Sequence, residues 1–201
     1  MQGSPAEDSA TQKQELRKLI RRKRAELDRR AERSQTVCQR IIELESYQNA
    51  SRVHLYIEAG SEVATKILVA SAFSLGKTVV VPWCTSDDRL AFFWIQSTND
   101  LTLGSHGILE PAPEITSDSS RKVLPESIPF WIIPGIAFDK QGGRMGQGRG
   151  HYDRVLSTLP PSTITLGLAF DCQLVDEVPR EPHDRPLSGV ATETGLFWRD
   201  A

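Results

Sequence analysis

The sequence has few cysteines, no long apolar run and almost no net charge. Its 201 residues include three cysteines, Cys38, Cys84 and Cys172, which are widely spaced and form no C-x-x-C pair. An odd number at this spacing argues against a disulfide scaffold and against a zinc ribbon. The formal charge of −2 at pH 7 provides no overall field to attract nucleic acid or anionic lipid.

Targeting and membrane signals are also missing. No stretch approaches the roughly 18 apolar residues of a transmembrane helix, and the start, MQGSPAEDSA, lacks the apolar segment of a secretory signal. We therefore expect a cytoplasmic protein, with no membrane or nucleic-acid partner, and we expect a monomer. The small, polar and acidic residues 1–11 predict a disordered tail, followed by one domain over residues 12–201.

Hydrophobic patterning predicts an α/β fold. The β-rich runs 52–58 and 77–83 flank a helical pattern at 62–75, and this strand–helix–strand order is typical of a parallel sheet covered on both faces. The predicted fold is a single three-layer α/β/α domain with a mostly parallel central sheet. The other expected elements are helices at 12–33, 37–44 and 152–159, strands at 90–96, 129–134 and 163–170, and a long excursion at 104–129.

The first predicted helix contains the basic string RKLIRRKR. Such a helix can bind nucleic acid or a membrane surface, and that possibility stays open at this point. Acidic residues interrupt the basic pattern at Glu15, Glu26 and Asp28, which favours a solvated helix face instead.

A glycine-rich segment, GGRMGQGRGHYDR at 142–154, joins a predicted buried strand to a predicted helix. Glycines at this place let backbone N–H groups approach a phosphate, and a helix start adds partial positive charge. Arg144 and Arg149 can donate charge-assisted hydrogen bonds to phosphate oxygens, and Asp153 can bind magnesium. The spacing matches neither the P-loop nor the dinucleotide motif, so a tight turn with solvated arginines remains an alternative.

The longer string PGIAFDKQGGRMGQGRGHYDR, at 134–154, resembles the signature of 5-formyltetrahydrofolate cyclo-ligases. The likeness extends over residues 12–195. Further stretches that agree in order are KQELR at 13–17, Tyr56-Ile57, EVAT at 62–65, GILEP at 107–111, LAFD at 168–171, and His183-Asp184.

This resemblance implies an ATP- and Mg²⁺-dependent conversion of 5-formyltetrahydrofolate into 5,10-methenyltetrahydrofolate. In that reaction the formyl oxygen attacks the γ-phosphate of ATP, and ADP leaves. The N10 atom of the folate then attacks the phosphorylated imidate, and phosphate is released. Such chemistry depends on positioning and charge neutralisation more than on a protein nucleophile.

The resemblance also assigns residues, position by position. Arg149 and Arg144 are the implied catalytic residues, and Asp153 is the implied magnesium ligand. The implied folate contacts are Ile57, Glu62, Gln147, Gly148, Arg149, Gly150 and His151. The implied ATP contacts are Lys13, Arg17, Arg144, Met145, Gly146, Gln147, Gly148, Arg149, Gly150, His151 and Tyr152.

Two positions depart from the family pattern. Ser188 stands where many members carry an aspartate as second magnesium ligand, and His151 stands where tyrosine or phenylalanine is common. A hydroxyl is a weaker ligand than a carboxylate for a hard cation. A relative that binds folate or nucleotide without turnover is therefore an alternative. A phosphoryl-transfer enzyme with another acceptor is a third possibility. The four histidines have no metal-ligand spacing, which argues against zinc.

Overall fold

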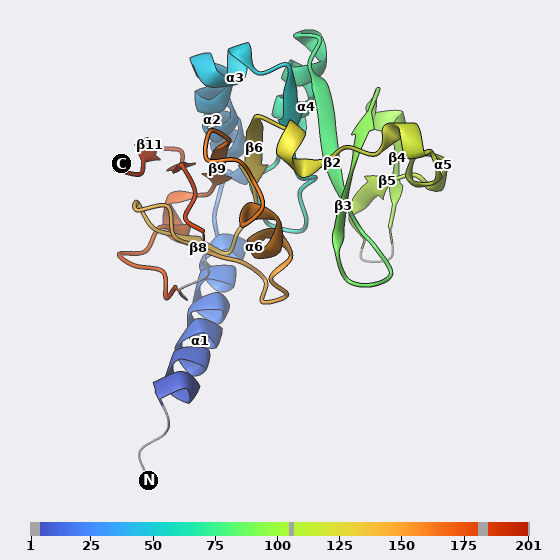
Figure 1. The fold of residues 1–201 in the computed structure, drawn as a ribbon. Coiled ribbons are helices and arrows are strands. Elements are labelled where there is room, and N and C mark those ends of the chain that lie inside the picture. Colours follow the sequence, from blue (N-terminus) through green and yellow to red (C-terminus); the bar gives the residue numbers. More distant parts are fainter. Residues whose placement is uncertain (1–4, 105–106, 181–184, 201) are drawn as a thin grey trace.

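The computed structural model describes residues 5–104, 107–180 and 185–200. A mixed sheet of seven strands runs through the protein, and Figure 1 shows how the helices lie around it. The strand order is β11-β10-β9-β6-β1-β2-β3. The five strands from β10 to β2 are parallel, and β11 and β3 pair antiparallel at the two edges. The strands are β1 (Arg52–His54), β2 (Thr78–Cys84), β3 (Leu90–Ile95), β6 (Phe130–Ile133), β9 (Ile164–Leu168), β10 (Gly189–Ala191) and β11 (Leu196–Trp198). The predicted α/β fold with a mostly parallel sheet is confirmed.

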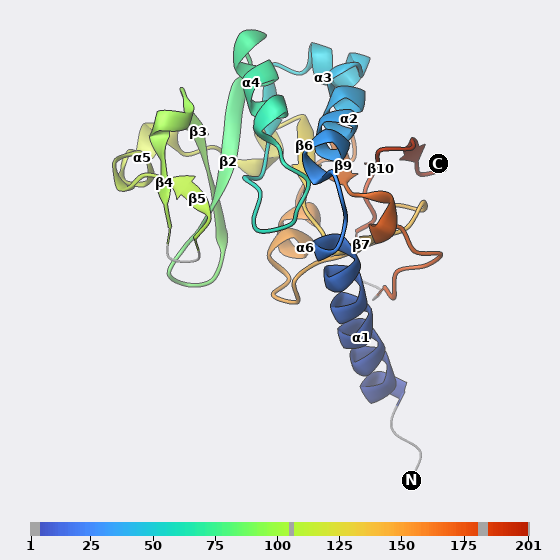
Figure 2. The ribbon, with the colours of Figure 1, turned by 180° about the vertical axis from the view of Figure 1, so that it is seen from behind.

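Helices and connecting segments cover both faces of this sheet. Alternate strand residues point to opposite faces, so Val79 and Val81 join one hydrophobic core and Val80 joins the other. One face carries α2 (Arg30–Ile42), α3 (Glu45–Asn49) and α4 (Lys66–Ser74), which lie in front in Figure 2. The opposite face carries the short helix α6 (His151–Leu156), whose Leu156 packs in the same core as Trp131.

The long excursion predicted at 104–129 is ordered over its described part. It packs beside the edge strand β3, where Val123 N donates to Phe92 O (2.8 Å) and the Arg121 guanidinium lies 3.8 Å from the Trp94 ring centre. A covered edge strand is protected from pairing with another chain. Its elements, with the turn before it, are η1 (Thr98–Asp100), β4 (Leu101–Leu103), β5 (Leu109–Pro111), α5 (Pro113–Ser117), η2 (Ser119–Arg121) and η3 (Pro125–Ser127).

Several helix boundaries differ from the expected ones. Helix α1 spans Pro5–Ala25, so it ends before residue 33, and it includes residues 5–11 of the expected tail; residues 1–4 lie outside the described residues. Helix α4 starts at Lys66 because the Thr65 hydroxyl donates to Tyr56 O (2.7 Å) and Thr65 N donates to the Glu58 carboxylate (3.0 Å). Polar side chains that bind the backbone in this way compete with helix formation. Among the described helices, none has the length and apolar character needed to cross a membrane.

Helix α1 is held against the hairpin that follows β6. Its Leu16 and Ile20 pack with Ile136 and Met145 of that hairpin in a small core of their own. The buried Arg24 near its end donates to Ser61 Oγ (2.9 Å) and Gly135 O (3.4 Å). These contacts place the basic face of α1 beside the glycine-rich segment.

The fully buried His54 makes stability depend on pH. Burial lowers the pKa of His54 to about 3, and its ring stacks on Trp131. An unfolded chain binds a proton at this histidine below pH 6.5 while the folded protein does not, so stability is lost as pH falls. The unfolding free energy therefore falls between pH 7 and pH 5, and His54 accounts for about 2 kcal/mol of this fall. We predict that His54→Asn removes that contribution. Urea unfolding at the two pH values measures this difference, and an unchanged loss would contradict the assignment.

Candidate functional site

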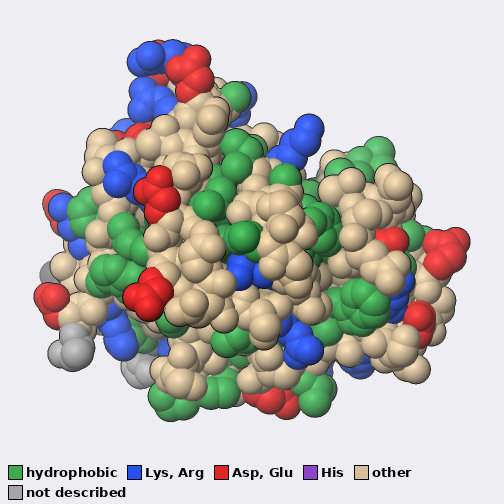
Figure 3. Space-filling view, turned by 90° about the horizontal axis from the view of Figure 1, so that it is seen from above, with side chains coloured by type: hydrophobic (Ala, Val, Ile, Leu, Met, Phe, Trp, Pro, Cys, Tyr) green, Lys and Arg blue, Asp and Glu red, His purple; other side chains and the backbone are tan. Residues whose placement is uncertain are grey.

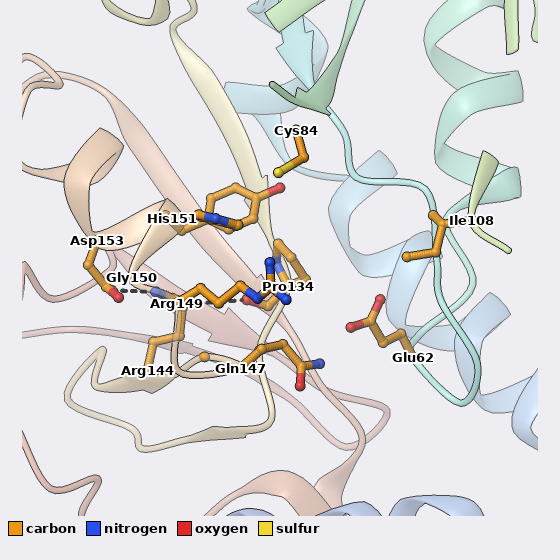
Figure 4. Close-up of a pocket in the computed structure, with 13 residues that line it drawn as sticks. Glu62, Cys84, Ile108, Pro134, Arg144, Gln147, Arg149, Gly150, His151 and Asp153 are labelled. Carbon is orange, nitrogen blue, oxygen red and sulfur yellow. Dashed lines mark hydrogen bonds and ion pairs between the residues drawn. The ribbon is translucent and has the colours of Figure 1, made fainter. Parts of the chain in front are cut away.

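The adjacent parallel strands β1, β2 and β6 end at the same edge of the sheet, and a cavity lies there. In open α/β sheets this edge is the usual ligand position. The cavity measures about 350 Å³ (Figure 4). It is lined by Glu62, Cys84, Ile108, Pro134, Gly135, Arg144, Gly146, Gln147, Arg149, Gly150, His151, Tyr152 and Asp153.

The glycine-rich segment forms one wall of the cavity. It begins with a hairpin of β7 (Ala137–Phe138) and β8 (Arg144–Met145) and then turns into α6. Gly148 (φ +100°) and Gly150 (φ +65°) adopt left-handed conformations that other residues enter only with strain. The glycines are thus required by the path of the backbone between β8 and α6.

The buried carboxylate of Asp139 fixes this hairpin. Its Oδ1 accepts hydrogen bonds from the backbone N–H groups of Gln141 (2.9 Å) and Gly143 (2.7 Å), and its Oδ2 accepts one from Val178 (2.9 Å). Arg180 Nη2 lies 3.5 Å from the same Oδ2. The sequence pattern does not reveal this role of Asp139, although the residue lies within the motif at 134–154.

Arg144 and Asp153 form an ion pair in the cavity wall. Arg144 Nη2 donates to Asp153 Oδ1, and Nη1 donates to Pro134 O (3.3 Å). The Arg144 side chain is 5% exposed, and its buried Nε has no hydrogen-bond partner among the residues that the structure describes. The predicted magnesium ligand and one predicted catalytic arginine therefore contact each other directly, and Arg144 is held in place on the cavity side.

Arg149 and His151 meet at Asp88, in the turn between β2 and β3. Arg149 Nη1 donates to Asp88 Oδ1 (2.9 Å), and His151 Nε2 lies 3.1 Å from the same oxygen. The hydrogen bond from Arg149 is the main reason that the pKa of Asp88 is lowered, with His151 adding to it. Both Arg149 and Asp88 are exposed, and exposed ion pairs contribute little to stability. Asp88 was missed in the sequence, because only the fold brings its turn to the glycine-rich segment.

The opposite wall of the cavity carries Glu62, as Figure 4 shows. Burial raises the pKa of Glu62, although Ala59 N donates to its carboxylate (3.0 Å) and Arg24 lies nearby. A second cavity of about 250 Å³ adjoins the first and shares Glu62, Gln147 and Tyr152 with it. Ile57 lines this second cavity, so the two folate-contacting residues predicted before the glycine-rich segment lie together.

The basic face of α1 borders the glycine-rich segment. Arg17 Nε donates to Gly146 O (3.1 Å), and Arg21 donates to the side-chain oxygen of Gln147. Lys13 lies one helical turn before Arg17 on the same face. The structure thus brings α1 to the predicted ATP segment, and a direct nucleotide contact of Lys13 stays a prediction.

From the glycine-rich segment onward, the predicted residues Met145, Gly148 and Ser188 do not line the cavity. The Met145 side chain is buried in the core between the hairpin and α1. The Ser188 hydroxyl accepts a hydrogen bond from Thr165 N (3.1 Å) near the start of β9, and it does not line the cavity. The motif residues His183 and Asp184 lie outside the described residues.

Fold and site together define an α/β protein with a ligand cavity between an arginine- and glycine-rich wall and a wall with a buried carboxyl group. Comparison with known proteins identifies the class more closely. The 5-formyltetrahydrofolate cyclo-ligase family matches residues 9–193. A 5-formyltetrahydrofolate cyclo-ligase from Haemophilus influenzae is 33% identical over 187 residues, which cover 90% of this chain and 97% of that protein. The protein of the same name from Escherichia coli is 32% identical over 89% of this chain and 99% of its own length.

Solved structures agree with this result. The 5,10-methenyltetrahydrofolate synthetase of Aquifex aeolicus superimposes with a TM-score of 0.80, at 29% identity over 94% of both chains. The Mycoplasma pneumoniae protein of that name shares the fold, with a TM-score of 0.72 at 23% identity over 90% of this chain and 98% of its own. The chain belongs to the 5-formyltetrahydrofolate cyclo-ligase family, and the expectation of an enzyme of this family is confirmed.

Asp139 offers a direct test of how the hairpin is held. We predict that Asp139→Ala lowers the free energy of unfolding by about 3 kcal/mol, because three backbone N–H groups lose a charged acceptor. Urea unfolding of this variant should be compared with that of Asp176→Ala, which removes an exposed aspartate from the neighbouring segment. A similar, small loss in both variants would contradict the role of Asp139.

Proposed function

We propose that this protein closes the ring of 5-formyltetrahydrofolate at the expense of ATP, with Mg²⁺, and forms 5,10-methenyltetrahydrofolate, ADP and phosphate. The observation that carries the proposal is the cavity of a cyclo-ligase family member in which the arginine- and glycine-rich wall faces Glu62. One wall suits a polyanion and the other suits a neutral polar ring system.

The triphosphate lies along the glycine-rich wall in this proposal. Because α6 has six residues, its dipole is small, and the anion is held mainly by loop N–H groups and guanidinium groups. Arg149 can exchange its exposed partner Asp88 for phosphate oxygens at little cost. Arg17, which already contacts Gly146, lies on the α1 side of the same segment.

The folate occupies the adjoining cavity, with Ile57 and Glu62 beside its pterin ring. A buried carboxyl group such as Glu62 can hydrogen-bond to the ring nitrogens, and Gln147 and Tyr152 lie where the two cavities meet. At this junction the formyl oxygen reaches the γ-phosphorus. Binding both reactants in adjoining cavities replaces an encounter in solution by a fixed geometry, which is the main catalytic contribution expected here.

The reaction proceeds in two steps. The formyl oxygen forms a bond to the γ-phosphorus while the bond to the β-phosphate oxygen breaks, so that ADP leaves. N10 then bonds to the formyl carbon and loses its proton to water, the carbon–oxygen bond breaks, and phosphate leaves with the former formyl oxygen. Arg149 and Arg144 stabilise the charge that develops on the phosphoryl oxygens.

Magnesium fits the residues at the cavity. Asp153 offers a carboxylate at the rim, and Mg²⁺ commonly uses one or two carboxylates together with phosphate oxygens and water. Bound there, the ion would neutralise phosphate charge. Asp153 also accepts from Arg144, and this contact orients its carboxylate. The Ser188 hydroxyl accepts a hydrogen bond from Thr165 N, and in this proposal it is not a magnesium ligand.

The decisive assay mixes the protein with MgATP and 5-formyltetrahydrofolate and follows the absorbance of the methenyl product. Substrate labelled with ¹⁸O in the formyl group should transfer the label to phosphate. Tight folate binding without product would favour a relative that binds folate or nucleotide without turnover. ATP consumption only with some other acceptor would favour a different phosphoryl-transfer enzyme. Cytoplasmic location, a monomeric state and the absence of nucleic-acid or membrane partners stay predictions.

Arg149 is expected to act mainly in the transition state. We predict that Arg149→Ala lowers kcat about 100-fold, as is typical when a positioned charge stabiliser is removed. The control is Arg89→Ala, which removes an exposed arginine paired with Asp87 in the nearby turn. Equal kcat values for the two variants would remove Arg149 from the catalytic role.

Asp153 is expected to hold the metal. We predict that Asp153→Asn raises the magnesium concentration needed for half-maximal rate by about 10-fold, because a neutral amide binds a hard cation more weakly. Magnesium titrations of the initial rate at fixed ATP measure this change. An unaltered titration would show that the ion is bound elsewhere.

The basic face of α1 is expected to affect ATP binding. Alanine at Lys13 and Arg17 should each raise the KM for ATP about 5-fold or more, because each removes a charge near the phosphates. Arg22→Ala, on another face of α1, is the matched control. An ATP KM that does not change in the first two variants would leave α1 with a purely structural role.

A further inference from the structure

Three side chains of metal-binding type meet at the rim of the cavity. Cys84 ends β2, Asp88 lies in the following turn, and His151 is the first residue of α6. Their Sγ, carboxylate oxygen and ring nitrogen all lie within 4.8 Å of one another. In Figure 4, Cys84 and His151 lie on the same side of the cavity, away from Glu62.

The distances suit a single ion. Cys84 Sγ lies 3.9 Å from Asp88 Oδ1, and His151 Nε2 lies 3.1 Å from that oxygen. Tetrahedral zinc with its usual bond lengths separates sulfur and oxygen ligands by about 3.6 Å, and nitrogen and oxygen ligands by about 3.4 Å. The two observed distances to Asp88 Oδ1 each differ from these values by about 0.3 Å, and the third pair, Cys84 Sγ and His151 Nε2, lies within 4.8 Å.

His151 provides an independent sign. Its Nε2 is buried and lies 3.1 Å from Asp88 Oδ1, and within the described part of the chain it has no hydrogen bond of standard geometry. Buried polar atoms are nearly always satisfied, so an unsatisfied one at a cluster of ligands calls for an explanation.

We propose that Cys84, Asp88 and His151 form a binding site for one Zn²⁺ ion, separate from the magnesium position at Asp153. Zn²⁺ binds thiolate, imidazole and carboxylate ligands, whereas Mg²⁺ prefers oxygen ligands. On binding, the Cys84 thiol releases its proton to solvent. Thiolate and carboxylate then balance the charge of the ion, and water completes the tetrahedron.

The site would tie the β2–β3 turn to the start of α6. Asp88 Oδ1 is also the atom that accepts from Arg149, so the ion and Arg149 compete for it. The inference depends on the geometry of these three residues and not on the proposed reaction, and its test needs no turnover.

Cobalt serves as the spectroscopic probe for the test. Untagged protein is titrated with Co²⁺, whose thiolate complexes absorb in the near ultraviolet, and Zn²⁺ is then added to displace it. We expect one Co²⁺ per chain with a thiolate band, displacement by one equivalent of Zn²⁺, and no displacement by millimolar Mg²⁺. Cys84→Ser should abolish the band, and His151→Phe should weaken binding at least 10-fold.

Cys172→Ser is the matched control, since it removes a half-buried cysteine that is not part of the cluster. It should bind Co²⁺ as the unaltered protein does. Zn²⁺ should raise the melting temperature of the unaltered and Cys172→Ser proteins but not of Cys84→Ser, and the melting curves also report whether each variant is folded. A missing band in the unaltered protein, or a band that persists in folded Cys84→Ser, would overturn the proposal.

Discussion

The hydrogen bonds of Asp139 to the backbone hold the hairpin between β6 and α6, and most of the site depends on that hairpin. One buried carboxylate accepts from Gln141, Gly143 and Val178, which joins the hairpin to the segment after β9. The hairpin in turn places Arg144 in the cavity wall and provides the surface on which α1 packs. The Asp139 carboxylate, through its backbone donors, thus supports three features: the position of the hairpin at the sheet edge, the placement of Arg144, and the packing of α1.

The two walls of the cavity differ in electrostatic character. Arg144 and Arg149 lie on one side, and Glu62, whose pKa burial raises, lies on the other. Arg144 is 5% exposed, whereas Arg149 is 62% exposed and pairs with an exposed aspartate. The first arginine is therefore preorganised, and the second can be redirected when an anion binds. Such a combination suits phosphoryl transfer, in which charge moves during the reaction.

Much of the fold could be predicted from local patterns. The apolar run at 77–83 and the strand before the glycine-rich segment have periodicities that sequence alone reveals. The short strands β10 and β11 were missed, because three residues carry too little pattern. The start of α4 was misplaced because Glu58 and Thr65 bind the backbone there, and hydrogen bonds of this kind are set by tertiary structure.

The functional site likewise contains some residues that the sequence reveals and others that only the fold reveals. The residues of the glycine-rich motif could be identified from the sequence, because they are neighbours in the chain and therefore also lie close together in the fold. Asp88 and the Cys84–Asp88–His151 cluster could not be found from spacing, because His151 joins the other two only when β2 and α6 come together in the fold. Asp139 lay within the motif, but its role depends on backbone donors as far away as Val178.

The central claim is that the segment Gly146–Gly150 binds the triphosphate of ATP through its backbone amides. Titration of ¹⁵N-labelled protein with the Mg²⁺ complex of a non-hydrolysable ATP analogue tests it most directly. The account predicts that the amide resonances of Gly146, Gly148 and Gly150 shift and saturate together with increasing nucleotide. If these resonances stayed in place while others moved, the triphosphate would be bound elsewhere and the account would be contradicted.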